Sequence, residues 1–132
     1  MNTTYFNNLI MNHTFGRNGT PNTLPSDYYL GLSSTTPTIA GDNVTEPSSE
    51  AGYARVGISA YLGNASEGEI SNTVAISFPE STAVWGTITH FTLFDAADNG
   101  NLLAFSEISP NRNVDSETTL TIKSGQFTLT LS

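Results

Sequence analysis

The stretch that decides the fold is Phe78–Ile108, FPESTAVWGTITHFTLFDAADNGNLLAFSEI. Two apolar runs, residues 85–94 and 102–108, flank the dipeptide Asn99-Gly100. Asn-Gly supplies the two positive-φ residues that a type I′ turn requires, and the β-branched and aromatic residues of the first run favour an extended strand. The stretch therefore predicts a long β-hairpin. Because both runs carry apolar residues at odd and even positions, we expect the hairpin to lie centrally, covered on both faces.

The predicted core residues of this hairpin are Trp85, His90, Phe91 and Phe94. His90 lies in the middle of the first run, a position typical of a hydrogen-bonded histidine in a core or an interface. Core packing is also the first expectation for Trp85 and the tyrosines. Aromatic anchors at a subunit contact are the alternative, because interfaces are enriched in tyrosine and tryptophan.

The rest of the chain predicts one all-β domain over residues 1–132. Further strands are expected over residues 27–33, 53–61 and 70–78, and a closing hairpin over residues 118–123 and 127–131, where apolar and polar residues alternate. A loop is expected over residues 109–113, SPNRN. Before them, Thr3 or Thr4 can cap a short helix over residues 5–13 within an N-terminal arm of residues 1–20. These elements predict an antiparallel β-sandwich, jelly-roll-like, with a short N-terminal helix and a long loop over residues 34–51.

The charge balance argues against a nucleic-acid partner. Twelve acidic residues stand against four basic ones, which gives a formal net charge of −8. Such a chain repels phosphate backbones. The sequence holds no apolar run of eighteen residues, so no membrane span is expected.

The sequence offers no catalytic or metal-binding pattern, and we expect neither an enzyme nor a cofactor. Cysteine is absent, and the two histidines, His13 and His90, lie on separate predicted elements. Asp95 and Glu107 could form a carboxylate pair for glycoside cleavage across the hairpin, but strand-end residues that bond backbone amides fit the pattern as well. The turn of residues 95–101, DAADNGN, lacks the spacing of a calcium loop.

Three groups of residues are candidates for contact with a partner. The helix stripe offers Phe6, Leu9 and Ile10, the long loop offers Ile39 and Val44, and one face of the strand over residues 53–61 offers Tyr53, Arg55 and Tyr61. A helix this short needs a surface to pack on. Apolar residues tucked under their own loop are the alternative for Ile39 and Val44.

The order of motifs along nearly the whole chain resembles a family of small virion proteins of tailed bacteriophages. Its members include capsid decoration (cement) proteins and proteins labelled tail-fibre-like. The motifs that carry the resemblance are Tyr28-Tyr29-Leu30-Gly31-Leu32-Ser33, Gly52-Tyr53-Ala54-Arg55-Val56, Ile76-Ser77-Phe78-Pro79, Trp85-Gly86-Thr87-Ile88-Thr89-His90-Phe91, Gly100-Asn101-Leu102-Leu103-Ala104 and Ser124-Gly125-Gln126-Phe127-Thr128-Leu129.

The resemblance implies a non-enzymatic protein of the virion, made in the host cytoplasm. Its first implication is a capsid decoration protein that binds the major capsid protein on the outer capsid surface and stabilises the head, as a homo-oligomer with a dimer favoured. A tail fibre, a collar or another tail-associated part is the alternative within the same family. A carbohydrate-binding β-sandwich module is the rival from another class, because aromatic residues on a sheet can hold sugars.

Overall fold

The computed structural model describes residues 1–130, so Leu131 at the end of the last predicted strand lies outside the described residues. Two short 3-10 turns, Ser49–Ala51 and Ser59–Tyr61, interrupt the chain. The helix and the strands are α1 (Thr4–Thr14), β1 (Tyr29–Ser33), β2 (Val56–Gly57), β3 (Glu69–Ser71), β4 (Ile76–Ser77), β5 (Gly86–Phe94), β6 (Leu102–Val114), β7 (Thr121–Ile122) and β8 (Thr128–Thr130).

The main sheet is antiparallel and has the strand order β2-β1-β5-β6. The predicted hairpin is confirmed: β5 pairs with β6, and Asn99 and Gly100 have φ values of 55° and 75°. The turn is wider than two residues, and the Asn101 N–H donates to the Asp95 carboxylate at 2.8 Å across it. Of the two hairpin strands, only β5 lies inside the sheet, because β6 lies at its edge.

Strand β6 runs through Val114, so the loop predicted over residues 109–113 is wrong. The register shifts between the pairs Ile88–Arg112 and His90–Glu107, which leaves residues 108–111 as a bulge within the strand. Pro110 lies in this bulge, where its missing N–H costs no ladder hydrogen bond. Beyond it the strand resumes, because Val114 is buried and accepts a hydrogen bond from the Trp85 N–H at 2.9 Å.

The second layer is an antiparallel ribbon in which β3 pairs with β8 and β4 pairs with β7. The predicted closing hairpin is therefore wrong, because β7 and β8 follow one another along the same partner segment. Asn72 lies in the interruption between β3 and β4 and stabilises it through hydrogen bonds. Its buried side-chain amide donates to the carbonyls of Val74 and Lys123 at 2.8 and 3.0 Å and accepts the Phe127 N–H at 3.0 Å.

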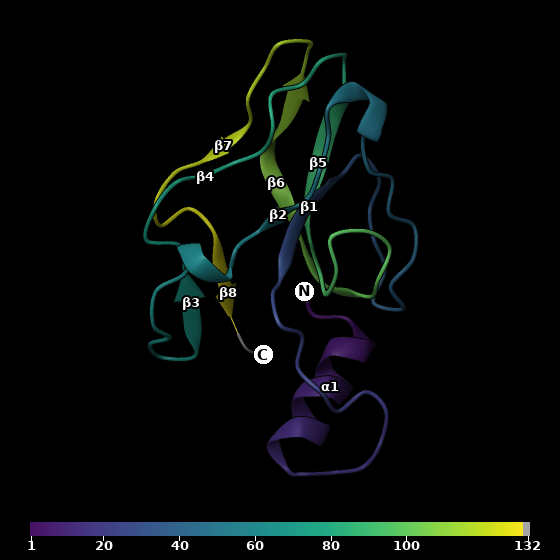
Figure 1. The fold of residues 1–132 in the computed structure, drawn as a ribbon, viewed down its shortest axis with the longest axis vertical. Helices are drawn as coiled ribbons and strands as arrows, with labels where there is room; N and C mark the ends of the chain where they lie inside the picture. The colour runs from purple at the N-terminus through teal and green to yellow at the C-terminus, as the bar shows by residue number, and fades with distance from the viewer. Residues whose placement is uncertain (131–132) are drawn as a thin grey trace.

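The two layers enclose one hydrophobic core. Figure 1 shows the main sheet in the middle, the ribbon along one side of it, and the connection between β1 and β2 on the other side. Residues of both layers are almost fully buried, among them Leu30, Leu32, Ile88, Ile76, Phe78 and Ile122. The chain is thus a mostly β, antiparallel, sandwich-like domain with one short helix. The finer jelly-roll topology stays a prediction.

The segment 53–61 departs from its predicted alternation. Only Val56–Gly57 pairs as a strand, and the chain turns away at Ser59–Tyr61. Tyr53 is buried and Ala54 is exposed, the reverse of the predicted faces. Tyr53 is held inside by its aromatic neighbours and by Glu46, whose contacts are described below.

The N-terminal arm is docked on the chain's own sheet. Thr3 is the N-cap of α1, as predicted, and its hydroxyl accepts the Phe6 N–H at 3.2 Å. The Thr3 N–H donates to the Leu103 carbonyl at 2.8 Å, and the Phe105 N–H donates to the Met1 carbonyl at 2.9 Å. Residues 1–3 therefore extend the outer edge of β6. Among residues 1–130, α1 is the only α-helix, and it is too short to cross a bilayer.

Candidate interaction surfaces

Trp85 joins the two layers and the long loop. Its ring packs edge-on against Tyr53, with centroids 5.5 Å apart, and Tyr53 stacks on Phe78 of the segment that follows β4. The indole N–H donates to the Ala51 carbonyl at 2.9 Å. Trp85 is therefore a core residue that also holds the end of the long loop.

Glu46, Tyr53 and Arg55 form a polar cluster, which we call the loop cluster, and the Glu46 side chain in it is 23% exposed. The Tyr53 hydroxyl donates to Glu46 Oε2 at 2.5 Å and accepts the Leu32 N–H of β1 at 3.0 Å. The Arg55 guanidinium donates to both oxygens of Glu46, at 2.9 and 2.7 Å. Such a bidentate pair fixes the geometry of both side chains. The cluster thereby attaches the long loop to the main sheet.

Arg55 also reaches the turn between β5 and β6. Its Nη1 donates to the carbonyls of Ala96 and Asn99 at 2.8 and 2.7 Å, and its guanidinium lies 3.6 Å above the centre of the Phe94 ring. Its side chain is only 6% exposed. Arg55 thus directs four of its five N–H donors to groups of its own chain, and its side chain is held inside the fold.

The loop cluster shifts the pKa values of its members. Burial, followed by the hydrogen bond to Glu46, raises the pKa of Tyr53 well above its ordinary value of 10.0. Burial alone would lower the pKa of Arg55, but the hydrogen bond and the charge of Glu46 outweigh it and raise that pKa. The cluster is therefore stable as a neutral phenol beside a paired carboxylate and guanidinium.

The pKa of Tyr53 predicts a loss of stability in alkali. Above about pH 10 the unfolded chain releases the Tyr53 proton while the folded chain retains it, so the free energy of unfolding falls by about 1.4 kcal/mol per pH unit from this group. Tyr53→Phe removes this term, and urea unfolding at about pH 9 and about pH 11 should show a shallower decline for the variant. Tyr61→Phe is the matched control, because the Tyr61 hydroxyl makes no hydrogen bond within residues 1–130. An identical decline in wild type and Tyr53→Phe would contradict the assignment.

The contact residues proposed from the sequence fall into two groups. Phe6, Leu9, Tyr53 and Arg55 are buried within the chain itself, so the prediction that they face a partner is wrong. They were predicted from the helical stripe and the alternation of side chains along a strand. Such patterns do not distinguish a face that packs inside the chain from one that is exposed. The side chains that remain accessible are half-buried or exposed, namely Ile10, Val44, Tyr61 and the 52% exposed Ile39.

The predicted core residues of the hairpin also differ among themselves. Trp85, His90 and Phe94 are buried, and the Thr89 hydroxyl lies 2.8 Å from His90 Nδ1. Phe91 is only half-buried, because its side of the sheet opens into a groove.

The structure does not assemble the carboxylate pair considered for glycoside cleavage. Glu107 lies opposite His90, whereas Asp95 follows the end of β5, five residues further along. At about 3.3 Å per residue these positions are roughly 16 Å apart, beyond the spacing of either glycosidase class. Among residues 1–130, no group of three histidine, aspartate or glutamate side chains could hold a metal ion.

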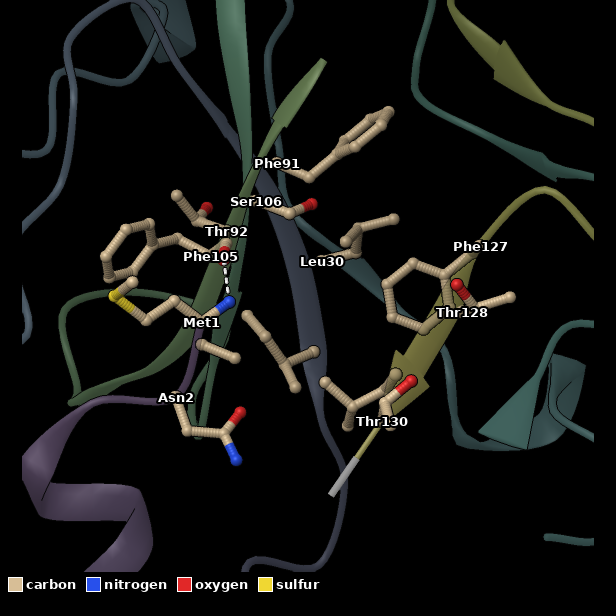
Figure 2. A pocket seen from close by; sticks show the side chains of 13 residues that line it. Met1, Asn2, Leu30, Phe91, Thr92, Phe105, Ser106, Phe127, Thr128 and Thr130 are labelled. Atoms are coloured by element: carbon tan, nitrogen blue, oxygen red, sulfur yellow. Dashed lines mark hydrogen bonds between the residues drawn. The ribbon is translucent and has the colours of Figure 1, made fainter. Parts of the chain in front are cut away.

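A groove lies between β6 of the main sheet and the ribbon strands β7 and β8, and we call it the interlayer groove. It has two parts, with cavity volumes of about 280 Å³ beside β8 and about 560 Å³ beside β7. Phe91, Ser106, Phe127 and Thr128 line both parts, which makes them continuous. Figure 2 shows the first part, with Phe91 and Leu30 of the main sheet on one side and Phe127 of the ribbon on the other.

Two of the four basic residues of the chain, Arg112 and Lys123, line the second part of the groove, with Glu107 beside them. Both are exposed. Within residues 1–130 the structure pairs only Arg55 with a carboxylate at salt-bridge distance. Sequence reasoning missed this site because it placed Arg112 in a loop and paired the segment of Lys123 with the wrong strand.

Comparison with known proteins adds the biological context. A family model described as "Podophage GP4 fiber I protein gp80" matches residues 1–130. No curated protein matches the chain. The match supports the phage virion structural protein that the sequence motifs implied, and with it a location in the virion. Because it covers nearly the whole chain, the chain belongs to the family of the podophage GP4 fiber I protein gp80.

Proposed function

We propose that the protein is a non-enzymatic structural subunit of a fibre on the phage particle. The observation that carries the proposal is the family match over residues 1–130, whose description names a fibre protein. The loop cluster fits a structural role, because Glu46, Tyr53 and Arg55 hydrogen-bond to one another and attach the long loop to the main sheet. Its partners would then be other fibre or tail structural proteins.

Capsid decoration is the second candidate, and the order of motifs from Tyr28 to Leu129 favours it. In that role the protein would bind the major capsid protein on the outer capsid surface and stabilise the head. The two roles differ in position, since a decoration protein covers the capsid lattice while a fibre projects from a few symmetric sites. A homo-oligomer, with a dimer as its simplest form, is part of either proposal.

A carbohydrate-binding module finds less support. Trp85 and Tyr53 are buried in the core, so neither is available to form a sugar platform. Tyr28, Tyr29 and Tyr61 are half-buried.

Gold-labelled antibodies against the protein, applied to purified particles of the phage that encodes it, test the fibre role. Label on thin projections is the expected result. Label spread evenly over the head would support capsid decoration instead, and particles without label, from which the protein is also absent by immunoblot, would contradict both roles.

A further inference from the structure

We propose that the interlayer groove binds an extended, acidic segment of a neighbouring particle protein, which adds as a strand to the open edge of β6. The identity of the partner as a particle protein rests on the proposed fibre role. The site itself rests on three observations: an unpaired strand edge, an apolar floor and a pair of free cations.

The first observation is the edge of β6. Within residues 1–130, Met1–Thr3 is the segment that pairs with this edge, and its last bonds join Met1 and Phe105 in both directions, at 2.5 and 2.9 Å. Outward-facing residues alternate along a strand, so Glu107 presents the next N–H and C=O in the same direction. Unpaired edges of this kind accept strands from other chains. The edge therefore already carries one added strand and is open at Glu107, just before the bulge of residues 108–111.

The second observation is the floor of the groove. Phe91 of β5 lies on one side, and Phe127 and Leu129 of the ribbon lie on the other. All three are only half-buried although they pack against the core. A strand laid along β6 would turn every second side chain toward these residues. Apolar side chains at those positions would complete the packing between the two layers.

The third observation is charge. The chain carries a formal net charge of −8, yet Arg112 and Lys123 lie together along the groove. Arg17 is elsewhere, next to the end of α1, and Arg55 is held inside by Glu46. With Glu107 also in its lining, the second part of the groove carries a formal charge of +1 on a chain of −8, and its two cations are complementary to an acidic segment. Such complementarity selects partners and speeds their encounter.

Synthetic peptides of about seven residues, a typical strand length, test the proposal directly. The probe is a fluorescent peptide in which valine and glutamate alternate, and binding is followed by anisotropy. The two controls alternate valine with lysine, or carry proline at the central valine, which removes a main-chain donor. We expect the acidic peptide to bind and both controls to bind at least about tenfold more weakly.

Arg112→Glu combined with Lys123→Glu should weaken binding of the acidic peptide by about tenfold, and added salt should narrow the difference. Arg17→Glu is the matched control, since Arg17 is exposed and lies outside the groove. Equal binding by the double variant and wild type would overturn the proposal. So would equal binding of the proline peptide. A wild-type dimer in light scattering that the double variant does not form would also overturn the proposal, because a second copy would then be the occupant.

A particle experiment separates this proposal from the fibre role. Wild type and the double variant are each supplied to a phage that lacks its own copy, and purified particles are assayed for the protein. Incorporation of wild type but not of the double variant supports the groove. Equal incorporation of wild type and the double variant overturns the proposed role of the groove and leaves the fibre role intact. Absence of both contradicts the virion role, and the peptide measurements then still decide what the groove binds.

Discussion

Replacing Glu46 by alanine should lower the free energy of unfolding by about 3–5 kcal/mol, because it leaves a buried arginine without its counter-charge. Arg55 would lose two charge-assisted hydrogen bonds, and the Tyr53 hydroxyl would lose its acceptor. Neither side chain can turn to solvent easily, since Tyr53 packs against Trp85 and Arg55 lies on Phe94. Urea unfolding of both proteins at neutral pH measures the difference.

Glu50→Ala is the matched control for Glu46→Ala. Glu50 lies in the same connection between β1 and β2 and carries the same charge, but it is exposed, and its carboxylate makes no hydrogen bond within residues 1–130. A change within about 0.5 kcal/mol is expected there. If Glu46→Ala were as stable as Glu50→Ala, the loop cluster would contribute nothing to the fold.

Trp85→Ala should be comparably destabilising, by about 3–5 kcal/mol, because it leaves a cavity where the layers and the loop meet. It also removes the donor to the Ala51 carbonyl. Trp85→Phe separates the two effects, since it keeps most of the packing and loses the hydrogen bond. That variant should lose only about 1–3 kcal/mol.

Chemical unfolding followed by circular dichroism measures both tryptophan variants. Val84→Ala is the control, because Val84 is the neighbouring residue and is 63% exposed. A soluble Trp85→Ala protein with the melting temperature of wild type would show that Trp85 does not hold the layers together.

The features predicted correctly from the sequence are those decided by local chemistry. Asn99-Gly100 indicated the place of the turn, although not its length, because few other dipeptides adopt two positive φ values in succession. Thr3 fixed the start of α1 because its hydroxyl can accept an N–H three residues on. Both signals lie within a few residues of the structure that they determine.

The features predicted wrongly depend on partners that lie far away in the sequence. The alternation of residues 118–131 is compatible with pairing to any strand. In the structure this segment pairs with β3 and β4, and Asn72, some 50 residues earlier, hydrogen-bonds to Lys123 and Phe127 between the two pairings. Tyr53 is buried against its local pattern because Glu46 and Trp85 reach it from other elements. The interlayer groove could not be predicted at all, since its walls come from β6 and from β7 and β8, which do not pair with each other within residues 1–130.

The number of copies of the protein in purified phage particles tests the fibre role most directly. Mass spectrometry with isotope-labelled peptides of this protein and of the major capsid protein gives the ratio of the two. A fibre subunit at a few symmetric attachment sites should be present in a few to tens of copies per particle. Hundreds of copies, in proportion to the capsid lattice, would contradict the fibre role and make the protein a capsid decoration protein.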